Sequence, residues 1–295
     1  MTGAGRYAPS PSGDLHLGNL RTALLAWLFA RSTSRAFVLR IEDLDRVRQG
    51  AEERQIADLR AIGLDWDDPI VRQSERLDRY ARAVASLQER GLTYECFCTR
   101  REIADAASAP HAPPGAYPGT CHELSEADRE RLRLQRASAL RLRADMSEFA
   151  VQDVFVGRYV GVVDDFVLVR GDGTPAYNLA VVVDDGEQGI DQVVRGDDLL
   201  SSAPRQAYLA GLLGIAAPTY VHVPLALNDR GERLAKRDGA VTLDDLQSQG
   251  VSTGAAYALI TQSLGLPALP PSDLVAVFDP AALPRTPWTF HPPRP

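Results

Sequence analysis

Residues 6–30 read RYAPSPSGDLHLGNLRTALLAWLFA. Prolines and glycines interrupt the first part of this stretch, and apolar side chains recur at helical spacing from Leu20 onward. The pattern predicts a strand at residues 6–8, a turn, and a buried helix over residues 20–31. A second predicted strand at residues 37–41 completes a βαβ unit, and later segments up to residue 225 predict the second half of a doubly wound α/β sheet.

His16 stands where the predicted helix begins, and Gly18 follows two residues later. The free N–H groups and the dipole at a helix N-terminus favour a bound phosphate, and a glycine lets a nucleotide approach the backbone. A histidine at this position can also be a simple helix cap, so the motif needs support from elsewhere in the chain.

That support comes from Lys236, the single lysine among 32 basic residues. It lies in the sequence RLAKR, residues 233–237, between Gly231 and Gly239. Lysine is a compact point charge on a flexible stem and suits one phosphate oxygen, whereas arginine is a planar fork of donors. Taken alone, this lysine could be a chance exception in an arginine-rich chain. A loop flanked by glycines could nevertheless close over a triphosphate.

Together these segments resemble the signatures of class I aminoacyl-tRNA synthetases. Residues 16–19 resemble the HIGH motif, and residues 233–237 resemble the KMSKS loop. Blocks at residues 39–45, 177–180, 184–185 and 194–200 narrow the resemblance to the glutamyl branch. Its short members without an anticodon-binding domain, the glutamyl-Q tRNA(Asp) synthetases, are the most similar.

Two departures from the signatures exist. Asn19 stands where the first motif ends in histidine, and Arg233 and Ala235 replace a lysine and a serine of the second. Both changes keep a polar or cationic role, so we expect them to affect the rate rather than the chemistry.

The resemblance implies a doubly wound, Rossmann-like catalytic domain with a zinc-bearing insertion and a small helical C-terminal region. We expect the first half of the nucleotide-binding fold at residues 1–92, the insertion at 93–170, the second half with the lysine loop at 171–240, and the helical extension at 241–295. The implied activity is ATP-dependent activation of L-glutamate to glutamyl-adenylate, with Mg²⁺ accompanying ATP. Transfer of glutamate to queuosine, at the wobble position of tRNA(Asp), would follow.

A carboxylate that attacks phosphate needs no general base, so the protein has to orient the reactants and spread negative charge. By the resemblance, His16, Asn19 and Lys236 are catalytic, and together with Gly18 they bind ATP. The implied glutamate-binding residues are Arg6, Tyr7, Ala8, Pro9, Ser10, Glu42, Tyr177 and Arg195.

Within that pocket, Glu42 directly follows a predicted strand and is implied to bind the α-amino group. Arg6 and Arg195 would bind carboxylates, and Tyr177 would add a hydroxyl group. Two arginines and one acid suit glutamate better than glutamine. Each residue alone could instead form a structural ion pair, for example Arg195 with Asp197 or Asp198.

The cysteines indicate a separate metal site. Cys96, Cys98 and Cys121 leave a tetrahedral zinc ion one ligand short. Coordination chemistry alone favours His122 or His111 as the fourth ligand, because imidazole is a commoner ligand than phenolate. The resemblance implies Tyr117 instead, and the alternative for the whole cluster is three buried cysteines without a metal.

Composition sets wider limits. With 295 residues, 45% of them hydrophobic, the chain is globular, and its apolar runs are shorter than the roughly 20 residues that span a bilayer. An odd number of cysteines argues against a disulfide framework and predicts a cytoplasmic protein. We expect a monomer, because every long apolar helix has an evident place in the core.

The net charge of −7 gives little support for RNA binding. Basic residues are concentrated in the first half of the chain, where Arg129, Arg131, Arg133 and Arg136 could follow a phosphate backbone. The same run could be a solvated helix face, since Glu126 and Glu130 are interleaved with it.

Three alternatives to queuosine modification remain open. One is a truncated glutamyl-tRNA synthetase that charges a tRNA 3′ end. Another is a nucleotidyltransferase, which would not need Arg6, Glu42 and Arg195 together. The third is a catalytically silent tRNA-binding paralogue, and the presence of His16 and Lys236 argues against it.

Overall fold

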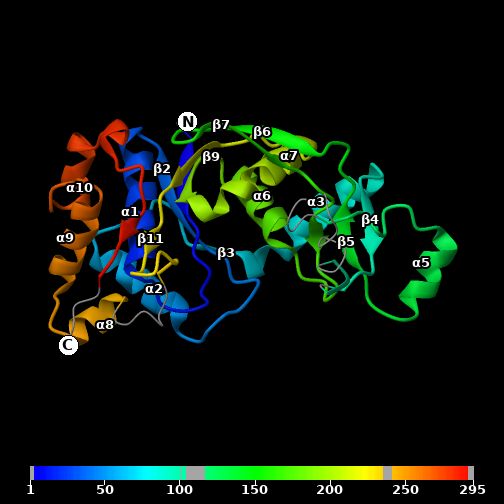
Figure 1. The fold of residues 1–295 in the computed structure, drawn as a ribbon, viewed down its shortest axis with the longest axis horizontal. Coiled ribbons are helices and arrows are strands. Elements are labelled where there is room, and N and C mark those ends of the chain that lie inside the picture. Colours follow the sequence, from blue (N-terminus) through cyan, green and yellow to red (C-terminus); the bar gives the residue numbers. More distant parts are fainter. Residues whose placement is uncertain (1–2, 100, 104–116, 235–240, 292–295) are drawn as a thin grey trace.

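The computed structural model describes residues 3–99, 101–103, 117–234 and 241–291. At its centre lies a seven-stranded sheet (Figure 1). In spatial order its strands are β3 (Val71–Arg72), β2 (Ala36–Ile41), β1 (Ala4–Tyr7), β9 (Ile190–Gly196), β10 (Thr219–Val223), β6 (Glu148–Asp153) and β7 (Gly157–Val162). All neighbours are parallel except β6 and β7. The order runs outward in both directions from β1 and β9, which confirms the predicted doubly wound fold and makes this pair the switch point of the sheet.

Alternate residues of the central strands face different helices. Phe37, Leu39 and Val194 pack in the core around α1 (Leu17–Ser32), whereas Val38 and Val193 pack in the core with α7 (Ala203–Leu212). The two helices therefore cover opposite faces of the sheet. The second face also receives α6 (Tyr177–Glu187), which leads into β9.

The helix predicted at residues 20–31 is α1, and it begins at Leu17 because His16 caps it. Almost its whole circumference is buried, since C-terminal helices cover the side that faces away from the sheet. These are α8 (Leu243–Ser248), α9 (Thr253–Ser263) and α10 (Pro271–Leu274). Figure 1 shows them beside α1 at one end of the molecule. The predicted helical C-terminal region is confirmed.

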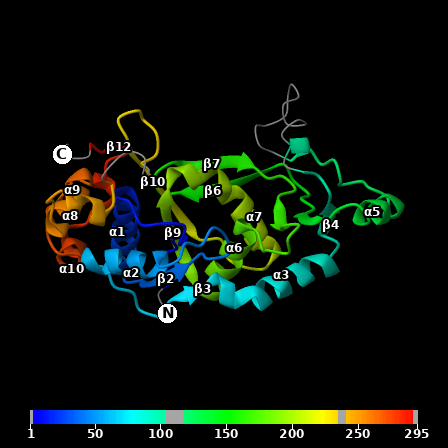
Figure 2. The same ribbon diagram turned by 90° about the horizontal axis from the view of Figure 1, so that it is seen from below.

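A smaller antiparallel sheet lies at the other end of the molecule (Figures 1 and 2). It consists of β4 (Thr93–Cys96), β5 (Ala139–Leu142) and β8 (Val167–Val169), with α5 (Glu126–Arg133) beyond it. The hairpin β6–β7 lies between β5 and β8 in sequence but joins the main sheet through β10. Residues 93–170 thus supply strands to both sheets, and the division of the chain into four parts stays a prediction.

The remaining elements connect these layers. The helix α2 (Ala51–Ala61) follows β2, and α3 (Leu77–Glu89) runs from the main sheet toward the small one, as Figure 2 shows. A short parallel pair, β11 (Ala226–Leu227) and β12 (Trp288–Thr289), ties the chain near its end to the segment after β10. Within the described part of the chain, none of the helices has the length and apolar character of a membrane span.

The burial of α1 gives a first prediction. Leu24 is fully buried between the sheet and the C-terminal helices, so Leu24→Ala leaves a cavity that neighbouring groups only partly fill. We expect the free energy of unfolding to fall by about 2–5 kcal/mol, measured by urea denaturation. Leu134→Ala, at a side chain that is 89% exposed, is the matched control and should change it by less than about 0.5 kcal/mol. Equal losses in both variants would contradict the central position of α1.

Candidate functional site

The face of the main sheet that α6 and α7 cover carries charged side chains toward the carboxyl ends of its strands. Arg40 of β2, Arg6 of β1 and Arg195 of β9 are all at most 5% exposed. They alternate with apolar neighbours such as Leu39 and Val194, which face α1. Because the strands are parallel, these charges converge beside the switch point, where open α/β sheets bind ligands.

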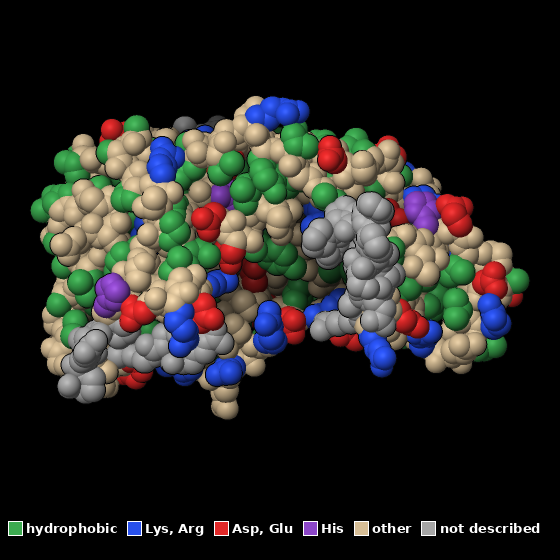
Figure 3. Space-filling model, viewed as in Figure 1, with side chains coloured by type: hydrophobic (Ala, Val, Ile, Leu, Met, Phe, Trp, Pro, Cys, Tyr) green, Lys and Arg blue, Asp and Glu red, His purple; other side chains and the backbone are tan. Residues whose placement is uncertain are grey.

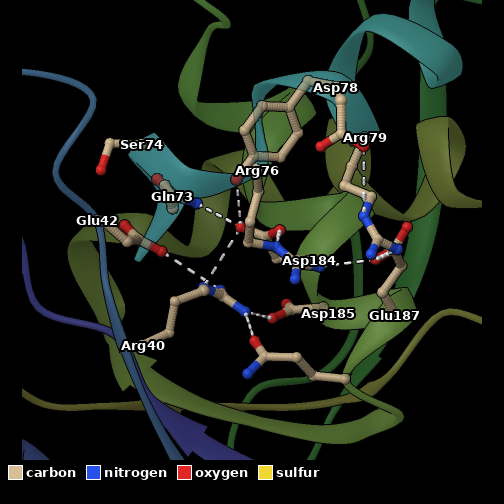
Figure 4. Close-up of polar contacts among 12 residues, drawn as sticks. Arg40, Glu42, Gln73, Ser74, Arg76, Asp78, Arg79, Asp184, Asp185 and Glu187 are labelled. Atoms are coloured by element: carbon tan, nitrogen blue, oxygen red, sulfur yellow. Dashed lines mark hydrogen bonds and ion pairs between the residues drawn. The ribbon is translucent and has the colours of Figure 1, made fainter. Parts of the chain in front are cut away.

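Glu42 follows β2 directly and is held by Arg40 (Figure 4). The Arg40 Nη2 atom donates to Glu42 Oε1 at 3.3 Å, while Nη1 donates to Asp185 Oδ1 and Gln188 Oε1, both at 2.8 Å. Burial alone lowers the pKa of the Arg40 guanidinium, and the neighbouring carboxylates, that of Asp185 first, raise the pKa by more. Arg40 is therefore a permanently charged anchor for Glu42.

The adjacent Asp184 connects the Arg40 network to the helical segments that surround it. It is fully buried and accepts hydrogen bonds from Gln73 Nε2 and Tyr80 Oη at 2.8 Å and from Arg76 Nε at 2.7 Å (Figure 4). Arg76 also donates to Glu187 at 2.8 Å. Tyr80 belongs to α3, and Gln73 and Arg76 belong to the 3-10 turn directly before it, so these bonds join α6, which carries Asp184 and Asp185, to that segment.

Arg6 lies next to this network. Its Nε atom is 3.4 Å from Asp185 Oδ1, and its Nη1 atom donates a long bond of 3.4 Å to the carbonyl oxygen of Val194. The buried Nε–H finds no hydrogen-bond acceptor among the described residues. Burial raises the pKa of Glu42 against the opposing effect of Arg40 and Arg6, with a net upward direction. Arg6 thus has one buried donor without an acceptor, close to the Glu42 carboxylate whose pKa it lowers.

A pocket of about 570 Å³ opens next to Glu42, between the main sheet and the small sheet. Ser10 and the half-exposed Tyr177 line it on one side, and Arg141 lines it on the other. On the face shown in Figure 3, acidic and basic side chains gather around a hollow between the two ends of the molecule. The predicted residues Glu42, Ser10 and Tyr177 therefore share one cavity.

Arg195 is bound by neutral partners rather than by the acids considered from the sequence. Its Nε atom donates to His222 Nε2 at 3.0 Å, and its Nη1 atom donates to Gln206 Oε1 at 2.7 Å. Asp198 accepts a bond from Arg233 at 2.7 Å instead. Among the described residues, Arg195 therefore has no carboxylate as an ion-pair partner.

The entry of α1 has the geometry of a capping box. His16 Nδ1 accepts from the Asn19 N–H at 3.2 Å, and Asn19 Oδ1 accepts from the His16 N–H at 3.1 Å. Because Nδ1 is an acceptor, the neutral imidazole carries its proton on Nε2. A Cβ atom on Gly18 would lie 2.8 Å from the Cβ of Ala226, so close packing against β11 also requires this glycine.

Lys236 lies outside the described residues. The chain nevertheless returns to the start of α1 directly after residue 240: Leu17 N–H donates to the Val241 carbonyl at 2.9 Å, and His16 forms a β-bridge with Thr242. On the other side, Leu234 N–H donates to the carbonyl of Ala226 at 3.1 Å. The two segments that flank the lysine motif therefore both lie near the His16 end of the helix.

The three cysteines form one cluster at the small sheet. The Sγ atoms of Cys96, Cys98 and Cys121 all lie within 4.8 Å of one another. The Tyr117 Oη atom is 3.3 Å from Cys96 Sγ and 3.6 Å from Cys98 Sγ. Three sulfur atoms and one phenolic oxygen in this arrangement fit a closed, four-ligand zinc site.

The rival ligand His122 has a different partner. Its Nδ1 atom lies 2.7 Å from Asp165 Oδ2, and its ring packs on Tyr94 at a centroid distance of 5.0 Å. His111, the other candidate, lies outside the described residues. The geometry favours Tyr117, although the identity of the fourth ligand stays a prediction.

The run of arginines between residues 129 and 136, in and just after α5, has acidic partners. Arg131 donates to Asp128 at 2.7 Å, and Arg136 donates to Glu102 at 3.1 Å. Arg133 bonds both Glu95 and Glu126. This arrangement favours the ion-paired, solvated face over a phosphate-binding one.

Arg40, Asp153, Gln206 and His222 did not emerge from the sequence as site residues. A signal for Arg40 existed, because a charge inside the apolar strand FVLRI, residues 37–41, needs a buried partner. No comparable signal existed for His222 or Gln206, whose importance depends on contacts between separate elements.

The fold and this arrangement of residues define the catalytic domain of a class I synthetase. The family model described as "tRNA synthetases class I (E and Q), catalytic domain" matches residues 4–267. A relative from Nocardia farcinica named glutamyl-Q tRNA(Asp) synthetase is 69% identical over 97% of this chain and 92% of its own length. One from Cutibacterium acnes with the same name is 57% identical over 90% of this chain and 76% of its own.

A solved structure agrees with these relatives. A glutamate tRNA ligase from Elizabethkingia meningosepticum in complex with its amino acid superposes with a TM-score of 0.84. It is 27% identical, and the match covers 99% of this chain and 68% of that one. The chain belongs to the class I tRNA synthetases and, among them, to the glutamyl-Q tRNA(Asp) synthetase family.

The cysteine cluster generates a second prediction. If zinc binds there, the purified protein should contain about one zinc ion per chain, and a chelator should lower its melting temperature. Tyr117→Phe should weaken zinc binding by about tenfold or more, measured by competition with a chromogenic chelator. His122→Gln should leave zinc affinity unchanged if Tyr117 is the ligand, and the reverse order would assign His122. A metal-free protein whose melting curve ignores chelators would exclude the site.

Proposed function

We propose that the protein activates L-glutamate with ATP and transfers it to queuosine at the wobble position of tRNA(Asp). The observation that carries the first half is the convergence of Glu42, Arg6 and Arg195 beside the switch point of the sheet. One carboxylate and two guanidinium groups complement the one ammonium and two carboxylate groups of glutamate. The names of the relatives support the second half.

In the first step a carboxylate oxygen of glutamate attacks the α-phosphorus of ATP. The bond between the α-phosphorus and the bridging oxygen breaks, pyrophosphate leaves, and glutamyl-adenylate forms. His16 would donate from Nε2, and Asn19 and Lys236 would add a donor and a charge where negative charge accumulates on the phosphates. The N-terminus of α1, including Gly18, would bind the nucleotide. Mg²⁺ accompanies ATP in class I synthetases.

Glutamate itself would be selected by charge. Glu42, held by Arg40, would bind the ammonium group, and Arg6 and Arg195 would each bind a carboxylate. Tyr177 would add its hydroxyl group, and the segment Tyr7, Ala8, Pro9 and Ser10 after β1 would form the wall. Glutamine would leave one buried guanidinium without a counter-charge, so the site discriminates against it.

In the second step a hydroxyl oxygen of the queuosine cyclopentenediol attacks the glutamyl carbonyl carbon. The bond between that carbon and the phosphate oxygen breaks, AMP leaves, and the hydroxyl proton passes to the AMP phosphate or to water. The base must leave the anticodon stack to reach the adenylate, as single-stranded bases do in RNA recognition. The pocket of about 570 Å³ next to Glu42 offers space for such a nucleoside between the two sheets. Zinc would have a structural role, holding the loops of the small sheet that border this pocket.

Pyrophosphate exchange tests the activation step. Wild-type protein with ATP, Mg²⁺ and glutamate, but without tRNA, should exchange labelled pyrophosphate into ATP, and glutamine should support far less exchange. Lys236→Ala should lower the exchange rate by about 100-fold or more with little change in melting temperature. Lys236→Arg is the matched control for charge and should recover only part of the rate. No exchange by the folded wild-type protein would favour the silent paralogue.

The acceptor needs a separate experiment. We expect glutamate to be transferred to tRNA(Asp) that contains queuosine and not to the same tRNA with guanosine at the wobble position. Nuclease digestion of the product should place labelled glutamate on the anticodon fragment. Label on the 3′-terminal adenosine would instead identify a truncated glutamyl-tRNA synthetase.

A further inference from the structure

A buried histidine and aspartate stand behind Arg195 on the same face of the main sheet. His222 of β10 is the direct register partner of Arg195 in β9, so the two side chains point to the same side. Asp153 ends β6, the next strand along. His222 is 2% exposed and Asp153 is 5% exposed, so water does not compete for their contacts.

The three residues form a continuous chain of hydrogen bonds. Arg195 Nε lies 3.0 Å from His222 Nε2, and His222 Nδ1 lies 2.7 Å from Asp153 Oδ2. An arginine N–H can only donate, so His222 Nε2 must be the acceptor and carry no proton. The proton of the neutral ring is then on Nδ1, where it is donated to the Asp153 carboxylate.

The environment keeps His222 in this form. Burial lowers the pKa of His222, and the hydrogen bond to Asp153 opposes this effect without reversing its direction. Asp153 is fixed in turn, because its Oδ1 atom accepts the N–H groups of Phe155 and Val156 at 2.8 and 2.9 Å. The ring of Tyr220 stacks on His222 with an interplanar angle of 20°.

Two further contacts complete the support of the guanidinium group. Gln206 accepts from Arg195 Nη1 at 2.7 Å and donates to Asn178 Oδ1 at 3.1 Å, which links Arg195 to the start of α6 beside Tyr177. The carbonyl oxygen of Leu199 accepts from Nη2 at 3.3 Å. Each terminal nitrogen carries two N–H groups and uses one of them in these contacts, so one N–H of each is left as a donor for a carboxylate ligand.

We infer that His222 and Asp153 are positioning residues for glutamate: Asp153 fixes the tautomer of His222, and His222 fixes the orientation in which Arg195 binds a substrate carboxylate. This inference rests on the proposed function. In this assignment both residues act through Arg195, so their loss should be seen in the KM for glutamate alone.

Pyrophosphate exchange with varied glutamate and varied ATP tests this assignment. His222→Leu removes the acceptor of Arg195 Nε and should raise the KM for glutamate by about tenfold or more, with kcat and the KM for ATP near wild type. His222→Gln keeps an acceptor within reach of Arg195 and should restore much of the affinity.

Asp153→Asn tests the role of the His222 tautomer, and it tests the assignment independently if His222→Leu does not fold. When the amide oxygen accepts the N–H groups of Phe155 and Val156, as Asp153 Oδ1 does, the amide nitrogen faces the imidazole. Nδ1 then has to accept, so Nε2 carries the proton and opposes Arg195 Nε–H. The KM for glutamate should again rise by about tenfold or more, as expected when the tautomer of a hydrogen-bonded histidine is wrong. Tyr208→Phe is the stability control. Tyr208 also lies on α7, and the substitution removes its 2.6 Å bond to the Asp145 carboxylate. It should lower the melting temperature without changing the KM for glutamate.

An unchanged KM for glutamate in folded Asp153→Asn and His222→Leu, or an equal rise in the KM for ATP, would overturn the assignment while leaving the proposed function intact. Absence of exchange by the wild-type protein would instead remove the proposed function and this inference with it.

Discussion

The structure depends on the compensation of positive charge inside the sheet. Arg40 is fully buried in a central strand, and a guanidinium group there is tolerated only because several acceptors surround it. Asp185 and Asp184 of α6, together with Glu42, supply that compensation, and Asp184 is bonded in turn to Arg76 and to Tyr80 of α3. Glu42 is oriented as a consequence. The same interactions therefore stabilise the packing of the helices on the sheet and position the acidic residue of the proposed glutamate site.

The two faces of the main sheet differ in character: one forms the apolar core, and the other carries charged side chains. The face toward α1 is apolar and continuous with the C-terminal helices, and it contributes most of the core. The opposite face carries Arg6, Arg40, Arg195 and His222 near the carboxyl ends of their strands, each with fixed partners. This division lets a rigid apolar layer support a charged one. Preorganised charges of this kind bind a charged ligand without further rearrangement of the protein.

The small sheet is connected to the catalytic fold through the chain itself and through the pocket beside Glu42. Its strands come from the segment between α3 and α6, and the β6–β7 hairpin from that segment extends the main sheet. The cysteine cluster lies where this sheet borders the pocket beside Glu42, since Cys98 lines that pocket. A metal in the cluster would hold the border of the pocket in place without taking part in the chemistry.

The sequence by itself determined the class of fold and the residues that bear charge around the proposed substrates. Alternating strands and helices, the Pro/Gly turn before His16 and the position of Glu42 directly after a strand are local features that can be read from short stretches of sequence. The tertiary structure alone decided the partners: Arg195 with His222 rather than Asp197 or Asp198, and acidic partners for Arg131 and Arg136. These choices follow from strand register and helix packing, which bring together side chains far apart in the chain, and no local pattern encodes which of several chemically suitable partners will be within reach.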